Sequence, residues 1–274
     1  MISKKTRSFL KWAGNKYRCL QHILPEFPKA TRLIEPFSGS GSIFMNTHYE
    51  EHVLAESNLD LIVLFQSIKT DGLSFINYCH EFFIENNNQK KQYYNLRDAF
   101  NDCCPKNNPE LRAALFLYLN RHGYNGLCRY NQNGMYNVPF GLHKKPYFPH
   151  QEMLHFHQQS NRATIIHSDF KQTFLHALPG DVIYCDPPYV PIEQQTNFTA
   201  YTGTNFSENE QINLANLANE FAQKGVTVLI SNHDTPLTRH YYKNATIKSF
   251  PVTRNINCKQ DGRMPAQELL AKFV

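Results

Sequence analysis

The strongest constraint on this chain is a short apolar run that ends in two consecutive prolines. The run Val182-Ile183-Tyr184 is β-branched and aromatic, which is typical of a buried parallel strand. It leads into Asp186-Pro187-Pro188-Tyr189, where the prolines fix two φ angles and remove two backbone donors. A carboxylate, proline carbonyls and an aromatic ring are therefore held rigidly at the carboxyl end of a strand, where open α/β sheets bind ligands.

This combination suits a planar amine, such as the exocyclic nitrogen of a nucleobase, because two acceptors lie beside a flat ring. The alternative is a strand-ending turn without a ligand, since Asp-Pro commonly begins turns. The tetrapeptide alone leaves both interpretations open.

Length and composition bound the remaining possibilities. With 274 residues, of which 41% are hydrophobic, the chain can form one large domain or two modest ones. No apolar run reaches the ~18–20 residues of a membrane span, and residues 1–7 lack the apolar core of a signal peptide. The seven cysteines are scattered without a CxxC pair, so we expect reduced thiols in a cytoplasm and no metal site.

The distribution of charge predicts a polyanionic partner. The net charge is only +5, yet no Asp or Glu occurs between Leu111 and Gln151. The lysines and arginines of that stretch are Arg112, Arg121, Arg129, Lys144 and Lys145. Because such a one-signed stretch repels itself unless a polyanion lies nearby, we expect nucleic acid to bind there.

A first glycine-containing segment follows Trp12, the only tryptophan in the chain. Ala13 and Gly14 are small enough for backbone to approach a ligand closely, and Asn15 tolerates left-handed geometry. Trp12 taken alone is as well explained by ordinary core packing.

A second glycine-containing segment predicts a nucleoside site. Residues 32–34 form a predicted buried strand, and Gly39 and Gly41 lie in the turn between it and a helical segment at 43–45. Such a turn lets backbone N–H groups face a ligand at a helix N-terminus. Glu56 ends the next predicted strand, where an acidic residue can accept both hydroxyls of a ribose.

Residues 70–160 are predicted to form a helical insertion, because Tyr93 to Phe100 and Leu111 to Leu119 have helix-like apolar spacing. Within it, Asn133-Gly134 between extended flanks is the strongest short hairpin signal. Arg129 could read a guanine edge, and Tyr124 could fill the gap left by an extruded base. The alternative is a solvated polar loop.

The sheet resumes at residues 163–170. Asp169 ends that predicted strand and could accept from an adenine amino group, with Phe170 against the ring; it could equally cap the following helix. Residues 191–206 are long enough for a lid, and Ser207 with Glu210 forms a capping box.

The C-terminal part completes the predicted sheet. A buried strand is predicted at 226–230 and a terminal antiparallel pair at 246–252 and 268–274. The basic residues of the loop between that pair are Arg254, Lys259 and Arg263.

Five segments, in this order, resemble the Dam family of DNA adenine-N6 methyltransferases, in the group whose target-recognition domain lies between the cofactor and catalytic motifs. They are Phe9 to Lys16, Glu35 to Ser42, Arg121 to Tyr147, Asp186 to Tyr189 and Ile230 to Asp234. The resemblance covers nearly the whole chain. Residues 116–149 and 231–234 are specific to that family rather than to methyltransferases generally.

The resemblance implies a fold, a methyl donor and a target. The fold would be α/β, with a Rossmann-like seven-stranded methyltransferase sheet and an inserted helical target-recognition domain carrying a β-hairpin. Residues 1–69 and 161–274 would form the catalytic and S-adenosylmethionine-binding domain, and residues 70–160 the target-recognition domain. The substrate would be adenine in double-stranded GATC, flipped out of the duplex. The protein would act as a monomer in the cytoplasm of a bacterium or be encoded by a phage.

Site residues are implied by position. Those implied to hold the cofactor are Trp12, Ala13, Gly14, Lys16, Glu35, Pro36, Phe37, Ser38, Gly39, Ser40, Gly41, Ser42, Glu56, Asp169, Phe170 and Asp186. Those implied to contact or invade the recognition site are Lys11, Tyr124, Asn125, Leu127, Arg129 and Pro139. Asn131, Asn137 and Lys144 would contact phosphates, and Asp186, Pro187, Pro188 and Tyr189 would form the catalytic motif.

Three positions depart from the family pattern. Asn15 replaces the commoner second glycine of the first motif, and Glu56 replaces an aspartate. Leu142 stands where close relatives carry arginine, so one backbone anchor to DNA is expected to be missing. The C-terminal basic loop also differs from the family pattern.

Other interpretations use parts of the same sequence. An RNA adenine or DNA cytosine-N4 methyltransferase would keep the chemistry, although Asp186 favours adenine by family habit and the hairpin favours duplex DNA. A non-enzymatic DNA-binding protein would need a damaged motif, and none is visible. A nucleotide-dependent dehydrogenase could use the glycine turn but gives residues 186–189 no role.

Overall fold

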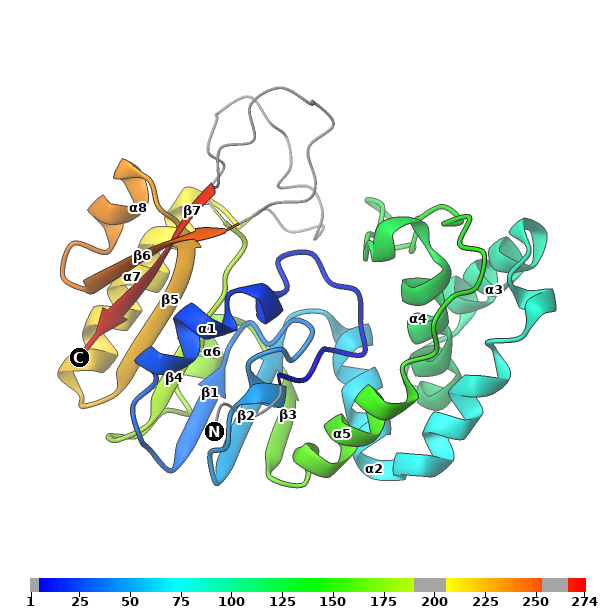
Figure 1. The fold of residues 1–274 in the computed structure, drawn as a ribbon, viewed down its shortest axis with the longest axis horizontal. Coiled ribbons are helices and arrows are strands. Elements are labelled where there is room, and N and C mark those ends of the chain that lie inside the picture. The colour runs from blue at the N-terminus through cyan, green and yellow to red at the C-terminus, as the bar shows by residue number, and fades with distance from the viewer. Residues whose placement is uncertain (1–4, 190–205, 253–265) are drawn as a thin grey trace.

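A computed structural model describes residues 5–189, 206–252 and 266–274, and in this part the strands form one seven-stranded sheet (Figure 1). The strand order is β3-β2-β1-β4-β5-β7-β6. The parallel strands are β1 (Arg32–Glu35), β2 (Glu51–Glu56), β3 (Ala163–His167), β4 (Val182–Cys185) and β5 (Thr227–His233). Two antiparallel strands, β7 (Ala266–Phe273) and β6 (Thr246–Val252), complete the sheet beside β5. The predicted Rossmann-like α/β sheet and its C-terminal antiparallel pair are confirmed.

Helices cover both faces of the sheet because side chains alternate along each buried strand. Ile34 and Ile183 belong to the core that contains α6 (Phe170–Phe174) and α7 (Glu208–Gln223). Leu33 and Tyr184 point to the opposite face, which contains α1 (Leu20–Ile23). The predicted capping box at Ser207 is present and opens α7. The remaining short helices are α8 (Pro236–Tyr241), η1 (Lys16–Arg18), η2 (Leu24–Glu26), η3 (Phe44–Asn46), η4 (Glu85–Asn87) and η5 (Tyr124–Gly126).

The strand order places a topological switch point between β1 and β4. From β1 the chain moves outward to β2 and β3, then returns to β4 on the other side of β1. The loops that leave the carboxyl ends of β1 and β4 therefore diverge and open a crevice, which is the usual ligand site of such sheets. Glu35 ends β1 and Asp186 follows β4 at this crevice.

Four longer helices separate β2 from β3 in sequence. They are α2 (Leu59–Glu81), α3 (Lys90–Asp102), α4 (Pro109–His122) and α5 (His150–Ser160). Figure 1 shows α3 and α4 at the end of the molecule away from β6 and β7. The helices predicted around residues 93–100 and 111–119 are confirmed by α3 and α4. The proposed domain boundary at 69/70 falls inside α2, close to Gly72, whose φ of 52° breaks the helix.

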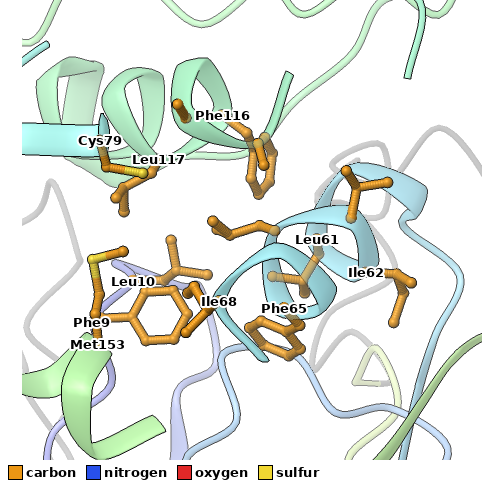
Figure 2. Close-up of a cluster of buried hydrophobic side chains, with 14 of the residues drawn as sticks. Phe9, Leu10, Leu61, Ile62, Phe65, Ile68, Cys79, Phe116, Leu117 and Met153 are labelled. Carbon is orange, nitrogen blue, oxygen red and sulfur yellow. The ribbon is translucent and has the colours of Figure 1, made fainter. Parts of the chain in front are cut away.

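The insertion shares a hydrophobic core with the sheet-packed part of the chain. Phe116 of α4, Phe65 of α2, Met153 of α5 and Phe9 of the N-terminal segment converge in one buried cluster (Figure 2). Leu54 of β2 belongs to the same cluster. Because one core joins these elements, α4 is held in a fixed position relative to the crevice.

A buried ionic network reinforces the join between α2 and α4. Arg112 donates from Nε and Nη2 to the two oxygens of Asp60 at 2.7 and 3.1 Å. Its Nη1 donates to the carbonyls of Phe100 and Cys103, and the Tyr130 hydroxyl donates to Asp60 Oδ2 at 2.5 Å. The base of the predicted hairpin is thus tied to the first turn of α2.

Two sets of predicted features lie outside the described residues: the proposed lid at 191–206, except for Phe206, and the basic residues Arg254, Lys259 and Arg263. Across the ranges that the structure covers, no helix is long and apolar enough to cross a membrane. In those same ranges, no cluster of three or more His, Cys, Asp or Glu residues could hold a metal ion.

Candidate active site

Asp186 lies at the carboxyl end of β4, directly beside a lysine from the first motif. Its Oδ1 lies 2.7 Å from Lys16 Nζ, and the two side chains are 20% and 5% exposed. Burial raises the pKa of Asp186 to about 6, although the nearby Lys16 ammonium opposes that shift. Asp186 is therefore an ionised acceptor only above about that pH.

Lys16 connects three parts of the crevice. Besides Asp186, its Nζ donates to the carbonyl of Gly14 at 2.7 Å and lies 4.6 Å from the centre of the Tyr189 ring. The sequence predicts that Lys16 contacts the cofactor, and that stays a prediction. In the structure its ammonium pairs with Asp186 and lies over the Tyr189 ring, so it links these two side chains.

The loop after β1 contains buried polar atoms that lack partners. Glu35 Oε1 and Ser38 Oγ accept or donate no hydrogen bond among the described residues, and both atoms are inaccessible to solvent. Burial and the charge of Asp186 raise the pKa of Glu35 to about 8. Since buried polar groups are normally satisfied, these two atoms are candidate partners for a ligand.

The glycine loop itself is closed by Glu56 and Trp12. The Gly39 N–H donates to Glu56 Oε2 at 3.1 Å, and the other oxygen of Glu56 accepts from the N–H groups of Ser57 and Asn58. Gly39 has a φ of 47°, and a Cβ there would lie only 3.2 Å from Trp12 Nε1. The structure brings Trp12 and Glu56 together at Gly39, and a lone pair of Glu56 Oε2 stays available for a hydroxyl.

The left-handed conformation that Asn15 would tolerate is taken by its neighbour. Asn15 has a φ of −50°, and Gly14, at φ 76°, lies in the left-handed region in the turn closed by the Asn15 N–H and the Trp12 carbonyl. The segment predicted as a helix after Gly41 forms only the short 3-10 turn η3. Asn15 instead donates from Nδ2 to Ser40 Oγ at 2.7 Å, which joins the two glycine-containing segments.

Asp169 takes the capping role that the sequence left open. Its Oδ1 accepts from the Gln172 N–H at 3.0 Å at the start of α6. Phe170 is buried and stacks on Phe37 with ring centres 5.5 Å apart. The two rings form an apolar wall beside the loop that follows β1, and contact of Asp169 with an adenine stays a prediction.

The predicted hairpin is narrow. It contains one isolated antiparallel bridge, between Tyr130 and Tyr136, rather than two extended strands. At its tip, Asn131 Oδ1 accepts from the N–H groups of Asn133 and Met135, each at 3.0 Å. Backbone bonds from Asn131 N–H to the Met135 carbonyl and from Asn137 N–H to the Arg129 carbonyl cross the hairpin, so these and the side-chain bonds hold its shape without a long β-ladder.

Arg129 and Asn137 face each other across the hairpin. Arg129 Nε donates to Asn137 Oδ1 at 2.7 Å, and its Nη2 donates to the Asn137 carbonyl at 3.1 Å. Asn137 was predicted to contact phosphate, but its side-chain oxygen supports Arg129 here. The guanidinium carries five donors, so this support fixes its plane and leaves others for a ligand.

The other predicted DNA-contacting residues gather around η5. The Tyr124 side chain is 51% exposed, its N–H donates to the Pro139 carbonyl, and Asn125 has a φ of 53°. Lys11 Nζ lies 3.1 Å from His143 Nε2 and 3.3 Å from the Arg121 carbonyl. Burial and the charge of Arg121 lower the pKa of Lys11.

Leu127 and Lys144 differ in how far they are available to a ligand. The Leu127 carbonyl accepts from the Tyr136 hydroxyl at 2.8 Å, and its half-buried side chain packs against the core. Lys144 is exposed, and its carbonyl accepts from Asn88 Nδ2. The Lys144 side chain is therefore accessible to a phosphate, whereas only part of the Leu127 side chain is accessible to a ligand.

Residues 12–256 match the family described as D12 class N6 adenine-specific DNA methyltransferase. The chain belongs to this family. It is 44% identical over 272 residues to a DNA adenine methylase of Vibrio cholerae, a match that covers 99% of this chain and 97% of that protein. It is 45% identical to the DNA adenine methylase of Serratia marcescens, covering 98% and 99%, and 43% identical to that of Escherichia coli K12, covering 98% and 96%.

For a D12-class methyltransferase, the donor group of the family fits the residues of the crevice. S-adenosylmethionine carries a sulfonium and an ammonium, and a nearby cation would favour the ionised form of Glu35, which lacks a partner at Oε1. Ser38 Oγ offers a second unpaired polar atom, and the wall of Phe37 and Phe170 offers an apolar surface for a base.

Sequence reasoning assigned no role to three residues around the catalytic motif of this D12-class enzyme. Gln211 donates from Nε2 to the Pro188 carbonyl at 2.7 Å, and its Oε1 accepts from Asn232 Nδ2 at 3.2 Å. Glu268 of β7 accepts from the Tyr189 hydroxyl. Asn232 lies in residues 231–234, which the sequence marks as family-specific, so that residue could have been singled out. Gln211 and Glu268 lie in no recognisable motif, and their partners are distant in sequence.

Proposed function

We propose that this adenine-specific DNA methyltransferase transfers the methyl group of S-adenosylmethionine to N6 of adenine in double-stranded GATC. The observation that carries the proposal is the half-buried Asp186 carboxylate at the switch point, near Glu35, whose Oε1 has no partner among the described residues, as Ser38 Oγ has none. An acceptor for an amine and unpaired polar atoms for a cation thus lie at the same end of the sheet, as transfer from a sulfonium to an amino group requires.

The residues we propose for the cofactor surround that crevice. Glu35 and Ser38 would receive the charged part of the molecule, Glu56 the ribose, and Phe37 and Phe170 the adenine ring. Trp12, Ala13, Gly14, Pro36, Gly39, Ser40, Gly41, Ser42 and Asp169 would line the remaining contacts. When bound, S-adenosylmethionine supplies an electrophilic methyl group on its sulfonium.

Catalysis would come from positioning and preorganised acceptors. The adenine amino nitrogen is a poor nucleophile because its lone pair is delocalised into the ring. Asp186 and the Pro187 carbonyl would accept its two N–H bonds, favour a pyramidal nitrogen and aim the lone pair along the transfer direction. The developing positive charge on nitrogen is stabilised by the Asp186 carboxylate without reorganisation.

Tyr189 would stack on an adenine that has left the duplex, because the reacting nitrogen is unreachable inside the stack. The ring is already fixed by the Lys16 ammonium on one side and by the His233 ring, which meets it edge-on at 4.5 Å. Pro188 keeps the ring attached to a rigid strand end through the hydrogen bond from Gln211.

Residues 70–160 would serve as the target-recognition domain, with residues 1–69 and 161–274 as the catalytic domain. Tyr124, exposed above a left-handed Asn125, would fill the space left by the flipped base. Lys11, Leu127, Arg129 and Pro139 would contact bases, and Asn131, Asn137 and Lys144 the backbone. We also propose that the enzyme acts as a cytoplasmic monomer without a metal.

Arg129→Ala is expected to remove about 1–3 kcal/mol of discrimination at one guanine of the site, because a bidentate guanidinium contact is lost. The measurement is kcat/KM on GATC duplexes and on duplexes with single substitutions. Lys145→Ala, a change in the same acid-free stretch, should weaken binding about equally across these duplexes. An unchanged preference for every base in the Arg129 variant would remove the proposed readout.

Leu142→Arg is expected to strengthen DNA binding and make it more salt-dependent. The Leu142 side chain is 80% exposed at a φ of 54°, where the family pattern has arginine. One added phosphate contact should steepen the slope of log K against log salt by about 0.9. Leu175→Arg, at another exposed leucine at the end of α6, is the control and should leave the slope unchanged. Equal slopes for the two variants would contradict a phosphate contact at position 142.

The proposed target is tested by expressing the enzyme in a bacterium that lacks adenine methylation. Mapping N6-methyladenine across the genome should give GATC as the modified sequence. A different consensus would refute the proposed target while leaving the family assignment intact.

A further inference from the structure

Glu268 is a buried carboxylate that reaches the catalytic motif from the other end of the chain. It lies on β7, paired in register with His233 of β5 and Phe250 of β6, and is 7% exposed. Its Oε2 accepts from the Tyr189 hydroxyl at 3.2 Å and from Cys19 Sγ at 3.8 Å. Glu268 therefore touches the ring of the catalytic motif but neither of the two groups proposed to contact the amine.

The position of Glu268 is unfavourable for folding alone. A buried carboxylate is stabilised by an opposite charge, yet both of its donors are neutral groups. Among the described residues, no lysine, arginine or histidine forms an ion pair with it. A carboxylate kept in such surroundings beside a catalytic motif indicates a functional role rather than a contribution to stability.

The Tyr189 ring has three supports, and Glu268 provides the one at its hydroxyl, which also interacts with the Asp186 carboxylate. Lys16 lies over the ring face, and His233 meets the ring at an angle of 84°. These two contacts restrain the plane of the ring, that is, its rotation about the Cβ–Cγ axis. The hydroxyl oxygen lies on that axis, so a hydrogen bond at the hydroxyl restrains a different motion, the swing of the whole ring about the Cα–Cβ bond, and thereby fixes where the ring lies.

We propose that Glu268 is a positioning residue that orients Tyr189 for stacking on the flipped adenine by accepting the hydrogen bond of its hydroxyl. The inference rests on the stacking role proposed above for Tyr189. It assigns part of the active site to the C-terminal antiparallel strand, which carries no motif recognisable in the sequence.

Glu268 also acts on Asp186 through its charge. Its carboxylate is one of the groups that raise the pKa of Asp186, after burial and against the effect of Lys16. A glutamine at position 268 removes the charge but keeps an oxygen acceptor, whereas methionine of similar length removes both. The two substitutions therefore separate orientation of Tyr189 from an electrostatic effect on Asp186.

The test is a double-mutant cycle measured as single-turnover methyl transfer by the full-length enzyme on a GATC duplex. E268M is expected to slow transfer about 10- to 100-fold, the range for losing a hydrogen bond to a charged group. E268Q should stay within about 3-fold of wild type, and Y189F should lose about as much as E268M. Adding E268M to Y189F should cost less than about 3-fold more, because the hydroxyl on which Glu268 acts is already gone.

Three results would overturn the proposal: no loss in E268M, an equal loss in E268M and E268Q, or the same loss from E268M with and without the Tyr189 hydroxyl. Binding of S-adenosylmethionine and thermal unfolding are measured for each variant and should match wild type. Replacing a buried charge by an apolar side chain is often neutral for folding. If E268M is nevertheless unstable, the proposal is tested by comparing transfer by E268Q, which keeps the acceptor, with transfer by Y189F, which removes the donor. Full activity of Asp186→Ala would instead refute the proposed function, since that outcome does not depend on Glu268.

Discussion

Asp186→Ala is expected to lower methyl transfer by at least about 10³-fold while the protein stays folded. The carboxylate is the proposed acceptor for the adenine amino group, and removing one preorganised electrostatic group from an active site costs about 10²–10³-fold. In this enzyme the alignment of the nitrogen lone pair with the methyl group is lost as well. The measurement is single-turnover transfer from S-adenosylmethionine to a GATC duplex.

The same substitution leaves Lys16 buried without its carboxylate, so activity has to be separated from folding. Lys16 keeps its hydrogen bond to the Gly14 carbonyl and its contact with the Tyr189 ring. Asp186→Asn is the closer replacement and should also be inactive, because an amide supplies one acceptor but no charge. Asp98→Ala, at an exposed carboxylate, is the matched control. Normal transfer by either Asp186 variant would show that the residue is not catalytic.

Arg112→Ala is expected to lower the free energy of unfolding by about 3–5 kcal/mol, the range for removing one partner of a buried ion pair. Asp60 would be left charged in the core, and the carbonyls of Phe100 and Cys103 would lose their donor. Among the described residues, the Tyr130 hydroxyl would then be the one remaining side-chain donor to Asp60. The measurement is urea unfolding followed by circular dichroism.

A double substitution separates this charge penalty from lost packing. Arg112→Met with Asp60→Asn removes both charges and should recover much of the loss, because no uncompensated ion remains. Lys224→Ala removes an exposed ion pair with Glu220 and should change stability by less than about 1 kcal/mol. A loss below about 1 kcal/mol in the Arg112 single variant would contradict the structural importance of the network.

Local sequence patterns predicted the parts of the fold that depend on neighbours in the chain. The apolar run before Asp186 became β4, and the Ser207 capping box opens α7 as predicted. Asn133-Gly134 predicted the turn but not its form. The flanks pair through a few backbone hydrogen bonds only, and the side-chain bonds of Arg129 to Asn137 and of Tyr130 to Asp60 reinforce this short pairing.

Contacts between distant residues were not predictable from local patterns. Lys16 was assigned to the cofactor because it lies in the first motif, yet it pairs with Asp186 across the switch point. Glu268 lies in a β-strand near the C-terminus without a recognisable motif, although it contacts Tyr189. Asp169 satisfied two patterns at once, and the structure confirms the helix cap. The contacts of Lys16 and Glu268 depend on the strand order, which brings segments far apart in sequence together, whereas the Asp169 cap is local.

The most direct test of the central claim is tritiated-methyl transfer from S-adenosylmethionine to two synthetic duplexes of equal composition. One contains a single GATC, and in the other that site is scrambled. The proposed function predicts incorporation only into the GATC duplex, recovered as N6-methyladenine. Incorporation into both duplexes, or into neither while the cofactor binds, would contradict it.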